Sequence, residues 1–246
     1  MDGSTTDLKC QPGTYTVTVS LEGYVSQTRS FQVAAGEHHA EQVQLALDPA
    51  FVAGLLEDAK TKLSAGNPGG AAESARRILK LTPGDLHPEE ILAEASFLTG
   101  DFQTFVDAGN NAIRAGGAVT IPLMHVHSFP HRMVHDVTLT FDRSGLTYKP
   151  AADTKGCKIQ SFTQPLSAIK DVVVQRDLSG SVELHLELAS SQMDLMAGGS
   201  QIPKPQHEKG VISLGIGNPK FIPIESPDNA EQLLLAVKNL MLALRG

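Results

Sequence analysis

Four histidines and one aspartate lie close together in the segment HVHSFPHRMVHD: His125, His127, His131, His135 and Asp136. Neutral imidazole is a good zinc ligand, and metal sites on sheets use two histidines separated by one residue, with a third ligand from elsewhere. On a strand, His125 and His127 would share a face. The segment therefore admits a metal site made from His125, His127 and either His131 or His135, and our metal hypothesis uses His125, His127 and His131.

The same histidines also fit a structural role, which we favour. Histidines on a strand often pack in the core or bond to backbone carbonyls. No HExxH arrangement accompanies them, and no cysteine lies near enough in the sequence to offer a fourth ligand. We therefore expect a chain without a cofactor and keep the metal site as the alternative.

Other reactive side chains lack the neighbours that catalysis needs. Cys157 is flanked by Lys155 and Lys158, whose positive charges would make the thiol more reactive. A nucleophile also needs an oriented base and an oxyanion site, and the sequence nominates neither. The chain contains no GxSxG elbow and neither of the phosphate-binding patterns GxGxxG and GxxxxGK. We predict that the protein is not an enzyme and has no catalytic residues.

Charge and hydropathy narrow the classes of partner. The 246-residue chain has a net charge of −7, and residues 118–246 hold twelve basic and twelve acidic side chains. Nucleic acid and anionic lipid both require clustered Lys and Arg, which the chain lacks. The most apolar stretch, LLLAVKNLMLALRG, is too short to span a bilayer and carries Lys238. The first ten residues are polar and lack the apolar centre of a signal peptide. We predict protein partners, no nucleic acid and no direct membrane insertion.

Residues 1–48 show the alternation of a small β-sheet unit. Tyr15, Val17 and Val19 alternate with threonines after a Pro-Gly turn, and the runs SQTRSFQVAAGE and AEQVQLAL follow. These patterns predict three antiparallel strands. The 36 residues from PGTY to VQLAL resemble the second half of a PEGA-type or carboxypeptidase-regulatory-like β-sandwich, in which a Pro-Gly-x-Tyr corner precedes the central strand.

The resemblance implies a bacterial signalling or cell-envelope protein, because PEGA-like repeats often belong to the outer portion of membrane-anchored bacterial proteins. The first strands of that family are missing here, and DGSTTDLKC stands in their place. We therefore expect the chain to be the C-terminal region of a longer protein. The alternative is a short three-stranded sheet that caps the next domain. The first case implies the cell envelope or the periplasmic face, and the second implies the cytoplasm.

Residues 49–117 are rich in alanine and carry apolar side chains at helical spacing. Gly66 and Gly100 lie 34 residues apart, and the same shift aligns Ala59 with Ala93. Thirty-four is the tetratricopeptide period, and the segment resembles that repeat, although its Trp and Tyr positions are missing. Because two repeats are fewer than such stacks need to stand alone, we expect these helices to pack on a neighbouring domain. They would serve as a spacer or as a peptide-binding groove.

Residues 118–246 return to a period of two and end in a helix that begins at Ser226, Pro227 and Asp228. Antiparallel strands followed by one helix resemble a pleckstrin-homology-like barrel, in which the helix plugs an open end. We interpret DVTLTFDRSGLTYKP as its first hairpin. Lipid binding in that family generally needs a basic loop there, whereas this turn sets Arg143 beside Asp142. The resemblance therefore implies a protein-interaction scaffold, with membrane-surface association as a further alternative.

Together these patterns predict an α+β multidomain chain. Its parts are a partial PEGA-like β-sandwich unit (residues 1–48), a tetratricopeptide-like helical region (49–117) and a PH-like antiparallel β-barrel with a C-terminal helix (118–246). The predicted function is a non-catalytic interaction scaffold, and the alternative is a metal-binding or sensor domain built on the histidines. The sequence leaves the oligomeric state open. Partner contacts are expected at Phe102, Phe105, Val126 and Phe129.

Overall fold

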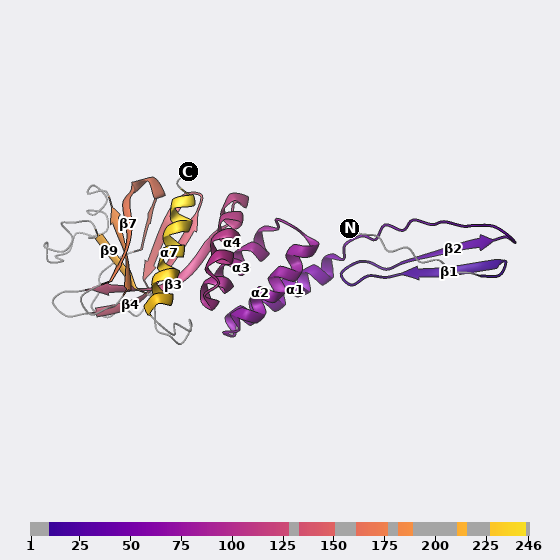
Figure 1. Ribbon diagram of the computed structural model, residues 1–246, viewed down its shortest axis with the longest axis horizontal. Helices are drawn as coiled ribbons and strands as arrows, with labels where there is room; N and C mark the ends of the chain where they lie inside the picture. Colours follow the sequence, from indigo (N-terminus) through magenta and orange to yellow (C-terminus); the bar gives the residue numbers. More distant parts are fainter. Residues whose placement is uncertain are drawn as a thin grey trace. The chain divides into compact units, whose positions relative to one another are not determined.

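The chain combines α-helices with antiparallel sheets, which confirms the predicted α+β class. It is described by a computed structural model, and Figure 1 shows its elements. The chain divides into two compact units, Met1–Gly54 and Leu55–Gly246. The structure describes residues 10–127, 133–150, 161–176, 182–188, 211–215 and 227–244.

The first unit contains an antiparallel pair of strands, β1 (Gly13–Val19) and β2 (Gln27–Val33). The β-branched residues that alternate along β1 suit a pleated strand and give it two different faces. On the polar face, hydroxyl groups bond across the pair, with Thr16 at 3.0 Å from Ser30. On the other face the rings of Tyr15 and Phe31 lie with their centroids 6.5 Å apart.

The prediction of a third strand over residues 40–47 was wrong. This segment makes a single isolated bridge, Tyr24 to Leu47, and the backbone N–H of Val25 donates to the carbonyl of Ala46 at 2.8 Å. The segment continues beside β2, where Gln27 Nε2 donates to the carbonyl of Gln44 at 2.8 Å. A strand needs a ladder of backbone hydrogen bonds, and the single bridge at Leu47 does not make one.

Four helices follow, and each begins or ends where the sequence supplies a cap. Asn67, Asp85 and Asp101 accept hydrogen bonds from backbone N–H groups in the first turns of the second, third and fourth helices. Gly100 ends the third helix with a φ of 77°, a left-handed conformation that suits glycine. The helices are α1 (Pro49–Ser64), α2 (Pro68–Leu81), α3 (Leu86–Thr99) and α4 (Phe102–Ala115).

The 34-residue shift found in the sequence aligns one helix with another. Moved by 34 residues, the bounds of α2 become those of α4. Small side chains line the contacts between the helices, and Ala59 and Ala93, which the shift aligns, are both fully buried. A polar network joins α1 to α2: the buried Ser74 hydroxyl donates to Asp58 Oδ2 at 2.6 Å, and Lys62 Nζ donates to the same carboxylate oxygen at 2.6 Å.

A seven-stranded antiparallel sheet follows the helices. Its strand order is β6-β5-β4-β3-β9-β8-β7, so two meanders join where β9 lies beside β3. Among the described residues β6 and β7 do not pair, and the sheet has no closed circuit of strands. The strands are β3 (Val119–His127), β4 (Met133–Asp142), β5 (Gly145–Pro150), β6 (Phe162–Gln164), β7 (Ile169–Arg176), β8 (Val182–Leu188) and β9 (Val211–Gly215).

The interpretation of the FDRSG turn as part of the first hairpin is wrong. The turn joins β4 to β5, because the strand of histidines, β3, already pairs with β4 as the first hairpin. The Asp142 carboxylate closes the turn by accepting from the backbone N–H and the hydroxyl of Ser144 at 2.7 and 2.6 Å. The residues between β3 and β4, 128–132, lie outside the described residues.

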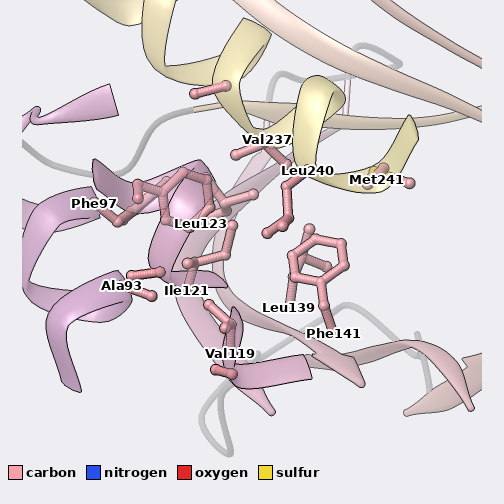
Figure 2. Packing of buried hydrophobic residues seen from close by; sticks show 14 of the residues in the cluster. Ala93, Phe97, Val119, Ile121, Leu123, Leu139, Phe141, Val237, Leu240 and Met241 are labelled. Atoms are coloured by element: carbon pink, nitrogen blue, oxygen red, sulfur yellow. The ribbon is translucent and has the colours of Figure 1, made fainter. Parts of the chain in front are cut away.

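One apolar core serves the helices and the sheet of the second unit. The final helix, α7 (Pro227–Ala243), contacts α4 on one side and β7 and β8 on the other (Figure 1). The expectation that the helices pack on a neighbouring part of the chain is confirmed. Figure 2 shows side chains of α3, β3, β4 and α7 meeting there: Ala93, Phe97, Val119, Ile121, Leu123, Leu139, Phe141, Val237, Leu240 and Met241.

At Gly109 the backbone of α4 lies close to the side chain of Leu240 in α7. A Cβ atom on Gly109 would lie 3.2 Å from Leu240 Cδ1 and 3.7 Å from Val119 Cγ2. Separations of that size leave no room for a larger side chain, since protein interiors are packed as densely as organic crystals. The helix crossing therefore depends on a residue without a side chain at this position.

Replacing Gly109 with valine should lower the free energy of unfolding by about 1–3 kcal/mol, because the added methyl groups must displace Leu240. Urea denaturation followed by circular dichroism measures the change. The matched control is Gly69→Val in α2, where a Cβ meets no atom within 4 Å. Equal stability of the two variants would show that α4 and α7 do not approach as described.

Candidate functional site

Strand β7 forms one edge of the described sheet. It pairs with β8 in the register Val172↔Leu186, and among the described strands it has no second neighbour. The register shifts between Ile169 and Asp171, as at a β-bulge. An edge strand carries backbone N–H and C=O groups on its open side, so β7 can accept another strand.

Exposed large apolar side chains occur on this strand and on the helix that contacts it. Val173 of β7 has 39% of its surface exposed, and Leu235 and Leu242 of α7 have 39% and 44%. In the described part of the second unit no other large apolar side chain is so exposed. We call Val173, Leu235 and Leu242 the edge surface. Its two leucines lie two helical turns apart on one face of α7.

The packing of α7 explains why these leucines remain outside. Leu234 and Val237 are buried, and so are Leu240 and Met241, because α7 is covered by α4 on one side and by the sheet on the other. These residues occupy about one third of the helix circumference. The remaining stripe faces outward and contains Leu235 and Leu242, together with the exposed Asn239 between them.

A cleft of about 700 Å³ opens between the end of α4, the β4–β5 turn and the end of α7. Three of its polar side chains, Arg143, Asp142 and Ser144, already make hydrogen bonds within the fold. Arg143 donates from Nε to the carbonyl of Ile113 at 3.1 Å and from Nη2 to the carbonyl of Arg114. It thereby caps the C-terminal end of α4, where a cation is favourable. The hydrogen bond from the Ser144 hydroxyl is the main reason that the pKa of Asp142 lies below its usual value.

The fold also shifts the pKa values of two glutamates of α3. Burial raises the pKa of Glu89, whose Oε1 accepts a hydrogen bond from Asn111 Nδ2 of α4 at 3.2 Å. Burial also raises the pKa of Glu94, for which the described residues supply no hydrogen bond or ion pair. Raised pKa values can mark a functional site. Here the hydrogen bond of Glu89 joins two helices, which is a structural role.

The predicted metal ligands are only partly within the structure. His125 and His127 lie in β3, and His131 lies outside the described residues. Among the side chains that the structure describes, no three His, Cys, Asp or Glu groups converge as metal ligands would. That statement does not reach the side chains of residues 124–135, which include Val126 and Phe129 of the predicted partner surface.

The two predicted contact residues on α4 lie in different environments. Phe105 is fully buried, and its ring packs against Phe97 of α3 with the centroids 5.4 Å apart. Phe102 is the first residue of α4 and is half-buried against the core. Phe105 therefore stabilises the pairing of α3 with α4 and offers no surface to a partner, whereas Phe102 is reached from outside in part.

Sequence reasoning did not find the edge surface. The run IKDVVVQ contains three consecutive valines, and a strand cannot turn all three to the same side. In the structure Val172 is buried and Val173 points away from it, exposed. The triple leucine at the start of the helical stripe in α7 carried the same signal, since one face of a helix cannot bury all three.

None of the helices in the described part of the chain is long and apolar enough to cross a membrane. Comparison with known protein families, with curated proteins and with solved structures finds no significant match to the chain.

Glu94→Gln should stabilise the protein at neutral pH and have a smaller effect in acid. Because burial raises the pKa of the folded carboxyl above its usual 4.5, the folded state holds the proton more tightly than the unfolded state. Stability then falls as pH rises from about 4.5 through the folded pKa, and the full penalty applies above it. Glutamine removes this penalty.

Thermal unfolding of both chains between pH 4 and pH 8 measures the effect. The control for the loss of a carboxylate is Glu73→Gln on the exposed face of α2. A stability difference for Glu94→Gln that stays constant with pH would contradict the desolvation of that carboxyl.

Proposed function

We propose that the chain is a non-catalytic protein-interaction region that binds its partner at β7 and α7. The observation that carries this proposal is the confinement of the exposed large apolar side chains of the second unit, among the described residues, to these two contacting elements. Exposed apolar side chains beside an open strand edge are typical of a site that accepts another chain.

An extended segment of the partner would add to the sheet beside β7. In this mode backbone hydrogen bonds supply much of the affinity and alternate side chains supply specificity. Val173 would contact the partner on the outer face of the sheet, and Leu235 and Leu242 would contact it along the helix. Apolar anchors near the centre of an interface usually contribute most of the binding energy.

The order of strands supports a PH-like architecture for the second half of the chain. The first four strands form a meander, the next three form another, and the last strand pairs with the first before a C-terminal helix. The 34-residue shift between α2 and α4 supports the tetratricopeptide-like interpretation. Together with the PEGA-like sequence of the first unit, these features favour a scaffold in a bacterial signalling or cell-envelope protein.

A photocrosslinking residue placed at Val173 or Leu235 should capture a discrete partner in the cells that naturally produce the chain. The expected result is one crosslinked band shared by both positions, because both lie on the edge surface. Mass spectrometry then identifies the captured protein. Binding of that purified protein should weaken at least tenfold with Val173→Lys or Leu235→Lys, since each places a charge in an apolar contact.

The matched control is the same photocrosslinking residue at Thr163. Thr163 is exposed on β6, the strand at the opposite end of the sheet. A band at Thr163 equal to that at Val173 would show that capture is not specific to β7. Unchanged affinity of the lysine variants, despite a crosslink, would show that the edge surface is not the interface.

A further inference from the structure

Strands β3 and β4 both depart from an apolar pattern at the same end of the sheet. Along β3 the alternate residues begin with Val119, Ile121 and Leu123, which are buried, and continue with His125 and His127. Positions of the same parity belong to the same face of a strand. The two histidines therefore continue the row that supplies the core.

Strand β4 brings a third histidine to the same place. The antiparallel register pairs Leu123 with Val137 and, two residues further, His125 with His135. Val137 is buried, so position 135 belongs to the same face of the sheet as the row in β3. Sequence spacing could not choose between His131 and His135 as a third ligand, whereas the register places His135 directly opposite His125.

Apolar residues occupy neighbouring positions of this face. Position 125 of β3 pairs with Leu214 of β9, and Leu214 pairs with Leu184 of β8, which is fully buried. Each imidazole carries one ring nitrogen that donates and one that accepts. A shared metal ion would satisfy one nitrogen on each of three rings at once.

We propose that His125, His127 and His135 bind one zinc ion. Residues directly opposite in an antiparallel pair have Cβ atoms about 4.5–5.5 Å apart, and alternate residues on a strand are about 6.5–7 Å apart. Three imidazoles at such separations can reach one ion at the usual Zn–N distance of about 2.0–2.1 Å. The pattern is a pair of histidines on one strand with a third on its antiparallel neighbour.

Three protein ligands leave the fourth tetrahedral position for water or for a ligand from outside the chain. Imidazole ligands also suit copper and nickel, and copper binds more tightly than zinc to most nitrogen sites. Which metal occupies such a site in the cell therefore depends on metal availability as well as on affinity. The proposal is independent of partner binding at β7, since the histidine row and the edge surface lie on different strands.

The test is titration of the full-length metal-free chain with zinc in competition with a chromophoric chelator. We expect one zinc ion per chain with a dissociation constant below 1 µM. Replacing His125, His127 or His135 with glutamine, one at a time, should each weaken binding more than about tenfold, because loss of an outer-shell partner alone often costs that much. Two matched variants, His131→Gln and His185→Gln, should bind as the wild type does.

His185 is a matched control because it lies on β8 next to Leu184, and adjacent residues of a strand belong to opposite faces of the sheet. A large loss with His131→Gln and none with His135→Gln would overturn the assignment in favour of the other ligand set. Wild-type affinity in His125→Gln and His135→Gln, or no binding tighter than 1 µM in the wild type, would overturn the site itself.

A second measurement does not require that the variants fold. X-ray absorption at the zinc edge of the loaded wild-type chain should show three imidazole nitrogens at about 2.0–2.1 Å. A first shell with one imidazole or with none would contradict the proposal, whatever affinity the titration finds.

Discussion

The structure of the second unit depends on how closely α4 can approach α7. At Gly109 the two helices meet with no side chain between the α4 backbone and Leu240. That approach sets α3 and α4 against β3, so that Phe97 and Phe105 enter the same core as Ile121 and Val237. A larger side chain at position 109 would have to displace Leu240 from this core.

The shared core also determines which surfaces are left for binding. Because α7 is covered on two sides, a single stripe with Leu235 and Leu242 faces outward. Because β7 is the end of the strand order, its open edge lies next to the same helix. The proposed interface is therefore a consequence of the way in which the helices pack and not of any local sequence motif.

Local features were the most predictable from the sequence. Capping residues such as Asn67 and Asp101 act within one turn of their own helix, so a pattern of nearby residues is sufficient to place the helix ends. The 34-residue repeat is also visible in the sequence, because it needs only a comparison of the chain with itself. The bounds of α2 and α4, which differ by 34 residues at both ends, agree with it.

Features that need a distant partner were predicted less well. Alternation shows that residues 40–47 suit a strand, but not whether their backbone pairs with a neighbour in a ladder, and in the structure it makes a single bridge. From the sequence, Phe105 could be an exposed aromatic contact residue. In the structure its ring packs against Phe97 of another helix. The bulge between Ile169 and Asp171 changes which valine of β7 faces outward, and a pattern of period two cannot anticipate such a shift. The pairing of His125 with His135 likewise required the register between two strands.

The β1–β2 hairpin gives the chain a gradient of local stability. In the described part of the first unit, Val33 is the one large apolar side chain that is buried, whereas the second unit has a continuous core. A two-stranded hairpin with so little buried surface opens at a small cost in free energy. Its amide protons should exchange with solvent long before those of β3 and β4, and proteases should cut it first. Under mechanical or thermal stress the first unit would therefore unravel while the residues from Leu55 onward remain folded.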